Sequence, residues 1–149
     1  MKFTLDGLSR SLADYLSPDL PHVTFYVGPN QQGTHPPAVF LRQTNARISL
    51  KPGGRFLRRL GLDLVYLERL NQPQGDRLLQ GAADVLDGVM ETFPYRCGGA
   101  STLLRTYNRR WEIAESTLHY KFDLKLHLTM EEDGVLMQSI QELNWEERP

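Results

Sequence analysis

The sequence predicts an α+β fold in which a mainly antiparallel sheet carries two helices packed on one face. Two segments, at about 4–16 and 75–93, have the three- and four-residue apolar spacing of amphipathic helices. Runs of strand-forming residues lie between and after them, and one run, 117–130, alternates apolar and polar side chains without a break. This alternation is typical of antiparallel strands with one solvated face, because the strands of a doubly covered parallel sheet are apolar throughout.

Length and composition are those of one globular domain, which we expect to span 1–149. The formal net charge is -1 and the pI is near 6.4, which argues against a dedicated nucleic-acid-binding protein. One cysteine, Cys97, excludes an internal disulfide and a thiolate metal cluster. We find no apolar run long enough to cross a membrane and no signal-peptide core at the N-terminus. The composition therefore predicts a protein of a reducing, aqueous compartment.

The first half of the chain predicts one helix and three strands. The helix at 4–16 should end at Ser17-Pro18, because the residue before proline is disfavoured in the α region. A strand is expected at 22–28, followed by a loop at 29–37 that has no aliphatic or aromatic side chain and should become ordered only against a partner. Strands from 38 to about 50 and from about 55 to 67 should be joined by the turn Lys51-Pro52-Gly53-Gly54.

The second half opens with the clearest helix. Its apolar stripe comprises Leu78, Leu79, Ala82, Ala83, Leu86, Val89, Met90 and Phe93. We expect the helix to pack on the sheet through Leu79, Ala82, Leu86, Val89, Met90 and Phe93. We expect Pro94 to end this helix, and we expect Gly81 and Gly88 on its flank to allow close approach of another backbone. A strand at about 103–115 should turn through Glu115-Ser116 into the alternating strand at 117–130, and a short last strand is expected around 136–143.

No set of residues in the sequence has the spacing of a catalytic or metal site. His119 and His127 would lie roughly 26 Å apart on one strand, at about 3.3 Å per residue, so we expect both to be solvated polar-face residues and not metal ligands. Cys97 is expected to be a buried filler, and Gly98-Gly99 a turn. The neighbouring carboxylates are charge runs and not a positioned acid and base. We therefore expect no enzyme, no metal and no cofactor.

Charge is segregated along the chain. The basic segment 42–59 holds six arginine or lysine residues and no acidic one, whereas the segment 131–147 holds six acidic residues and no basic one. These segments could be two solvated surfaces, the two sides of a head-to-tail contact between copies, or, for the arginines, a surface that faces a polyanion such as DNA. The candidate interface residues are Arg42, Arg47, Arg55, Arg58, Arg59, Glu131, Glu132 and Asp133.

The order of elements resembles a known protein family. The chain begins with a helix, an early strand and a proline-rich loop. A basic segment then leads into Leu62-Asp63-Leu64-Val65-Tyr66-Leu67. After it come a helix, the stretch around Phe122-Asp123-Leu124 and an acidic end. This pattern resembles the tail terminator, or tail completion, proteins of long-tailed bacteriophages and prophages. The resemblance implies a non-enzymatic protein of the virion tail or neck that assembles in the bacterial cytoplasm.

The same resemblance implies the partners. Proteins of that family form hexameric rings that cap the tail tube, stop its elongation and present a surface to the connector of the head. The implied partners are further copies of the chain, the tail tube protein and a head-completion or connector protein, with DNA passing nearby and no membrane. The sequence leaves two alternatives open: another phage neck or connector protein, or a monomeric α+β domain that binds a ligand or catalyses a reaction.

Overall fold

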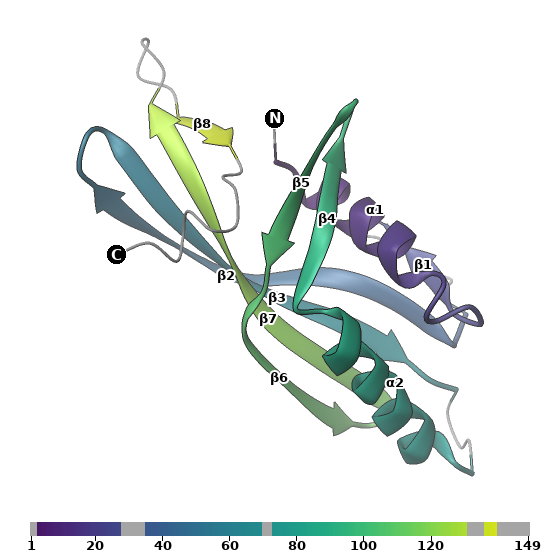
Figure 1. Ribbon diagram of the computed structural model, residues 1–149. Coiled ribbons are helices and arrows are strands. Elements are labelled where there is room, and N and C mark those ends of the chain that lie inside the picture. The colour runs from purple at the N-terminus through teal and green to yellow at the C-terminus, as the bar shows by residue number, and fades with distance from the viewer. Residues whose placement is uncertain (1–2, 28–34, 70–72, 131–135, 140–149) are drawn as a thin grey trace.

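The computed structural model describes residues 3–27, 35–69, 73–130 and 136–139, and it confirms the α+β class (Figure 1). Two helices and a largely antiparallel set of strands follow one another along the chain. In chain order the elements are α1 (Leu5–Leu16), β1 (Thr24–Tyr26), β2 (Ala38–Lys51), β3 (Arg55–Leu67), α2 (Gly75–Val89), β4 (Thr92–Cys97), β5 (Ala100–Arg105), β6 (Tyr107–Ala114), β7 (Thr117–Met130) and β8 (Leu136–Ser139).

The main sheet has the strand order β1-β2-β3-β7-β6, and β8 pairs with β7 beyond the end of β6. Only β1 runs parallel to its neighbour among these described strands, since β2, β3, β7, β6 and β8 pair antiparallel. The strands β4 and β5 form a separate hairpin. The two longest pairings are β2 with β3 and β3 with β7. Their registers determine which side chains share a face of the sheet.

Both helices cover the same face of this sheet. Leu62 of β3 lies opposite Phe122 of β7, and Leu64 lies opposite Tyr120, so these side chains point to one side. They belong to one hydrophobic core, whose helical members include Leu12 of α1 and Leu86 of α2. We refer to this as the helix side of the sheet, and to the opposite side as the helix-free face.

Helix α1 is held by its cap and by the β4–β5 hairpin. The Thr4 hydroxyl accepts a hydrogen bond from the Gly7 amide at 3.0 Å, as expected of an N-cap. The Thr4 amide in turn donates to the hydroxyl of Tyr95 in β4 at 3.1 Å, and the Tyr95 ring is fully buried. Tyr15 donates to the carbonyl of Val89 at 2.7 Å, which ties α1 to the end of α2.

Helix α2 packs through the predicted stripe, but it is shorter than expected. Leu79, Ala83 and Leu86 are buried, whereas Leu78 is exposed. The helix ends at Val89 and not at 93, because Pro94 cannot continue it and Thr92 and Phe93 favour extended backbone. Phe93 is still a core residue, as predicted, but it reaches the core from β4.

The expected single strand at 103–115 is wrong, because the structure divides this segment between two sheets. Strand β5 pairs with β4, and β6 pairs with β7, with Thr106 between them. Gly98 has φ +61° in the two-residue turn Gly98–Gly99 of the β4–β5 hairpin, which confirms the turn. Cys97 beside this turn is exposed, so its expected role as a buried filler is also wrong.

Other boundaries agree with the expectations to within a few residues. Gly53 and Gly54 have φ of +79° and +72° in the turn between β2 and β3. Strand β1 is shorter than the predicted 22–28, and β8 covers 136–139 of the predicted 136–143. Residues 140–143 and 29–34 lie outside the described residues, so the expectations for that part of the last strand and for most of the proline-rich loop stay predictions.

The far ends of β2 and β3 form a projection, residues 46–60, that we call the arm. It extends away from both helices, and α2 lies toward the other end of the sheet (Figure 1). The pairings agree with this view, because Arg55 lies opposite Thr129 near one end of β7, whereas Asp87 of α2 bonds to Tyr120 near the other. Every residue from 42 to 55 is exposed. Phe56, Leu57 and Arg58 are half-buried and Leu60 is buried, so the part of the arm that is open to partners is its β2 strand and the turn.

Candidate interaction surface

The strand register divides the basic segment between the two faces of the sheet. Arg47 lies opposite Arg59, and Lys51 lies opposite Arg55. Because alternate residues of a strand point to opposite sides, these side chains share the helix-free face with Arg42, whereas Arg58 points to the helix side. The structure thus brings Arg42, Arg47, Arg55 and Arg59 to one face and separates Arg58 from them.

Three cations form a row across the helix-free face, from the arm to the neighbouring strand β7. Arg59 lies between Arg47 on β2 and Lys125 on β7, each directly opposite in the register. Lys125 Nζ also lies 4.1 Å from the centre of the Tyr107 ring. Like charges directly opposite on neighbouring strands destabilise a sheet. The repulsion between Arg47 and Arg59 therefore costs stability, and an anionic partner at these two arginines would relieve that cost.

The other half of the same face is neutralised by its own carboxylates. Arg42 Nη2 is 3.0 Å from Asp63 Oδ2, Arg110 Nη1 is 3.4 Å from Asp123 Oδ1, and Lys121 Nζ is 3.0 Å from Glu112 Oε1.

The Lys121 ammonium, which donates a hydrogen bond to Glu112 and adds its charge, lowers the pKa of that carboxyl. In the described residues of the arm, by contrast, neither Arg47 nor Arg59 forms an ion pair. The excess positive charge is concentrated on the arm.

The helix side of the arm has a different character. Ile48 lies opposite Arg58, and Leu50 lies opposite Phe56. Ile48 is 48% exposed and Leu50 is 73% exposed, an unusual position for large apolar side chains. This face is apolar with one cation, whereas the helix-free face of the arm is cationic.

The acidic candidates Glu131, Glu132 and Asp133 lie outside the described residues, so their place at an interface stays a prediction. Sequence reasoning missed Lys125, which completes the cation row. Its position in an alternating strand predicts only that it is on the polar face. Its neighbours follow from the pairing of β3 with β7, which links residues far apart in the chain, such as Arg59 and Lys125.

The histidines do not build a metal site. Among the described residues, no group of three or more His, Cys, Asp and Glu side chains is placed to hold a metal ion. His119 Nδ1 lies 2.9 Å from Oδ2 of Asp63, which is fully buried, and the His119 side chain is 25% exposed. His127 is 4% exposed, so the expectation that it is solvated is wrong. Asp63 and His119 tie β3 to β7 on the helix-free face.

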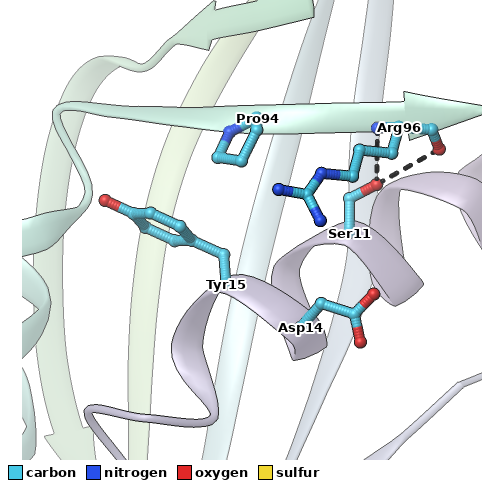
Figure 2. A pocket seen from close by; sticks show the side chains of 5 residues that line it. All are labelled: Ser11, Asp14, Tyr15, Pro94 and Arg96. Atoms are coloured by element: carbon cyan, nitrogen blue, oxygen red, sulfur yellow. Dashed lines mark hydrogen bonds between the residues drawn. The ribbon is translucent and has the colours of Figure 1, made fainter. Parts of the chain in front are cut away.

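A shallow hollow of about 200 Å³ lies between α1 and β4 (Figure 2). Its lining is Ser11, Asp14, Tyr15, Pro94 and Arg96. The Arg96 amide donates to Ser11 Oγ at 3.0 Å, so the hydroxyl already serves to hold the hairpin against the helix. Pockets for small ligands are typically larger, at about 300–1,000 Å³, with converging polar groups. The hollow therefore gives no support to the alternative of a ligand-binding or enzymatic domain.

A polar network around the buried Tyr120 fixes α2 to the sheet. Tyr120 donates to Asp87 Oδ1 at 2.7 Å, and Arg109 Nη1 donates to the Asp87 carbonyl at 3.1 Å. Burial, helped by the bond to Asp87, raises the pKa of Tyr120 to about 12, and burial raises the pKa of Tyr66 likewise to about 12. With the pKa raised, both phenols stay neutral, and their role is to stabilise the fold.

These observations first define a class. Within its described ranges the molecule is an α+β protein with a projecting, cationic sheet arm and no cluster of metal-binding side chains, and none of its helices is long and apolar enough to cross a membrane. Residues 7–135 match the family described as phage tail terminator protein, so the chain belongs to that family. No curated protein matches the chain. Membership makes it a structural protein of the phage tail, as the resemblance implied.

Proposed function

We propose that copies of this chain form a ring, expected to be a hexamer, that caps the finished tail tube, ends its elongation and presents the surface to which the head attaches. The observation that carries the proposal is membership of the tail terminator family over residues 7–135. The exposed arm supports it, because the arm carries cations on its helix-free face and the open apolar residues Ile48 and Leu50 on its helix side, and exposed surfaces of both kinds are suited to protein contacts. Assembly would take place in the host cytoplasm, with the tail tube protein and a head-completion or connector protein as the other partners.

Within this assembly, we assign Arg47 and Arg59 of the cation row to an anionic partner. Two sources fit: the carboxylates of Glu131, Glu132 and Asp133 on a neighbouring copy, or the phosphate backbone of DNA passing through the ring. Either source would relieve the repulsion across the row. The row is thus a contact that stabilises the assembled state and not the free subunit.

The test is complementation of a phage that lacks this protein with the double variant Arg47→Glu, Arg59→Glu. If the row meets a neighbouring copy, we expect a folded subunit that no longer terminates tails, so that electron micrographs show overlong or headless tails. Exposed ion pairs contribute only about 0–1 kcal/mol each to stability, so the thermal midpoint should barely move. The control is Arg10→Glu on the exposed side of α1. Normal tails and full infectivity from the double variant would refute the role of the row.

A second step separates the two anion sources. If the row meets the acidic segment of a neighbour, reversal of Glu131 and Glu132 to lysine in the same protein should restore normal tails. If the row faces DNA, this reversal should restore nothing, and the double variant should instead cap tails of normal length whose particles retain DNA poorly.

A further inference from the structure

Strand β2 has a long open edge in the arm. It pairs with β1 only from Ala38 to Phe40, whereas its pairing with β3 continues to Lys51. In the part of the chain that the structure describes, no strand pairs with the outer edge of β2 over residues 41–51. Residues 42–51 are exposed, and none of them is proline. Such an edge presents unpaired backbone N–H and C=O groups on which a further strand can pair.

A second open edge lies on the opposite side of the sheet. At the level of the arm the strand order is β2-β3-β7-β8, and one row of the register crosses all four strands through Ser49, Leu57, His127 and Ser139. Within the described ranges no strand pairs with the outer edge of β8, and Figure 1 shows β8 and the arm on opposite sides of β7. Neighbouring strands lie about 4.8 Å apart, so β2 and β8 of one copy are roughly 14 Å apart and cannot pair with each other.

Charge distinguishes β8 from the other open edges. Strand β2 carries cations and no acidic residue, so pairing of β2 with a second β2 would bring like charges together. Strand β1 is uncharged and only three residues long. Strands β4, β5 and β6 are net positive, from Arg96, from Arg105, and from Arg109 and Arg110 against Glu112. Strand β8 is itself uncharged, but the segment 131–147 that contains it holds six acidic residues and no basic one. Among these edges, β8 is therefore the one whose surroundings complement β2.

One cation of the sheet lies near β8 without reversing this balance. Lys125 is two residues along β7 from His127, the partner of Ser139. Its Nζ lies 4.1 Å from the centre of the Tyr107 ring, toward β6. One ammonium set against six carboxylates leaves the surroundings of the β8 edge acidic.

The strand directions agree with a contact between these two edges. Strands β2, β3, β7 and β8 pair antiparallel in succession, so β2 and β8 run in opposite directions. Copies related by a rotation about an axis roughly along the strands keep these directions. The β8 edge of one copy then meets the β2 edge of the next as an antiparallel pair, the arrangement that the rest of the arm already has.

We propose that β8 of one copy pairs with the open edge of β2 of a second copy over residues 46–51. The two edges differ and lie on opposite sides of the sheet, so the contact is head-to-tail and closes into a ring when the rotation between copies allows it. The joined sheets add neighbours to Ile48 and Leu50, which are 48% and 73% exposed in a single copy. This inference rests on the proposed ring and names the contact that builds it.

Disulfide cross-linking on assembled tails tests the pairing. In a Cys97→Ser background, which removes the exposed native thiol, Ser139→Cys is combined with Ser49→Cys, or with Arg47→Cys or Lys51→Cys two residues to either side. Each pair of variants is co-expressed in cells infected by a phage that lacks the gene, and the purified tails are oxidised. We expect a covalent dimer from the pair that the register brings together, and none from Ser139→Cys or Ser49→Cys alone.

Two further pairs test the rival edges. Ser139→Cys with Glu112→Cys on β6, or with Ser101→Cys on β5, should give no dimer, although both of these partner sites are exposed. One chain that carries both Ser49→Cys and Ser139→Cys should give a ladder of covalent oligomers. An internal bridge is excluded there, because a disulfide needs Cα atoms within about 7 Å and these two lie roughly 14 Å apart. A dimer through β6, through β5 or through two copies of Ser49→Cys overturns the proposed pairing.

Proline substitution tests the backbone hydrogen bonds without relying on side chains. Successive residues of a strand direct their N–H groups to alternate sides, so one of Ile48→Pro and Ser49→Pro removes an N–H bonded to β3 and the other an N–H of the open edge. We expect the first to have a lower thermal midpoint, and the second to stay folded by circular dichroism yet leave tails uncapped. Ile48→Ala and Ser49→Ala control for the lost side chains and should cap tails. Capping at wild-type frequency by the folded proline variant overturns the contact.

The outcomes separate this contact from the proposed function. Rings at tail ends with no covalent dimer from any of the three β2 positions overturn the pairing and leave the ring intact. Tails that carry no ring of this protein overturn the proposed function and the pairing together.

Discussion

Replacing Arg59 by glutamine should make the free subunit more stable. Arg59 lies directly opposite two cations, Arg47 on one side and Lys125 on the other. The Cβ atoms at such positions lie about 5 Å apart. Two unit charges separated by that distance in water repel by about 0.8 kcal/mol. Long side chains splay apart and salt screens them, so we expect the change to raise the free energy of unfolding by about 0.5–1 kcal/mol at low ionic strength.

The assay is urea denaturation of wild type and variant at 20 mM and at 500 mM NaCl, followed by circular dichroism. The gain should appear as a higher midpoint at an unchanged slope, and it should shrink at high salt. Arg10→Gln is the matched control: Arg10 lies four residues from both Asp6 and Asp14 on α1, so its loss should leave stability unchanged or slightly lower. A variant Arg59→Gln that is less stable than wild type at low salt would refute the strain assigned to the row.

Three further predictions concern the fold. Leu86→Ala should lower the free energy of unfolding by about 2–5 kcal/mol, because Leu86 is 1% exposed in the core, and a loss below about 1 kcal/mol in urea denaturation would contradict its place there. Gly7→Ala should cost about 1–3 kcal/mol in the same assay, because the new Cβ would lie 2.7 Å from the hydroxyl oxygen of the buried Tyr95; a neutral result would contradict this packing. The raised pKa of Tyr120, about 12 because of burial and then the Asp87 hydrogen bond, means that stability is full below the unfolded pKa near 10 and falls as pH rises from there toward 12. Tyr120→Phe should make that alkaline fall shallower, measured by thermal midpoints from pH 9 to pH 12, and an unchanged slope would contradict the assignment.

The elements with strong periodicity could be predicted from sequence. The alternation in 117–130 and the stripe around Leu86 each reflect a face that must be buried, and the core confirms both. The region after α2 could not be predicted, because Phe93 continues the helical spacing of the stripe although it lies in β4. Phe93 has the same burial in either arrangement, so the hydrophobic pattern could not distinguish them; Pro94 and the Gly98–Gly99 turn were the signals of the hairpin.

The candidate surface could be predicted only in part. The concentration of arginines in 42–59 is visible in sequence, and the structure places those residues on an exposed arm. The separation of Arg58 from Arg59 follows from alternation, but its consequence depends on which face the helices cover. The addition of Lys125 depends on the pairing of β3 with β7, which is a property of the fold. For that reason the different character of the two faces of the arm emerges only from the structure.

The most direct measurement of the central claim is the position and stoichiometry of this protein on tails, read together with tail length. Tails are purified from cells that carry the wild-type or the deleted gene, the protein is labelled, and lengths and label positions are scored by electron microscopy. We predict one ring of label at the end of each wild-type tail and a single tail length, with overlong and headless tails when the gene is deleted. Label distributed along the tube, or tails of uniform length joined to heads without the protein, would contradict the account.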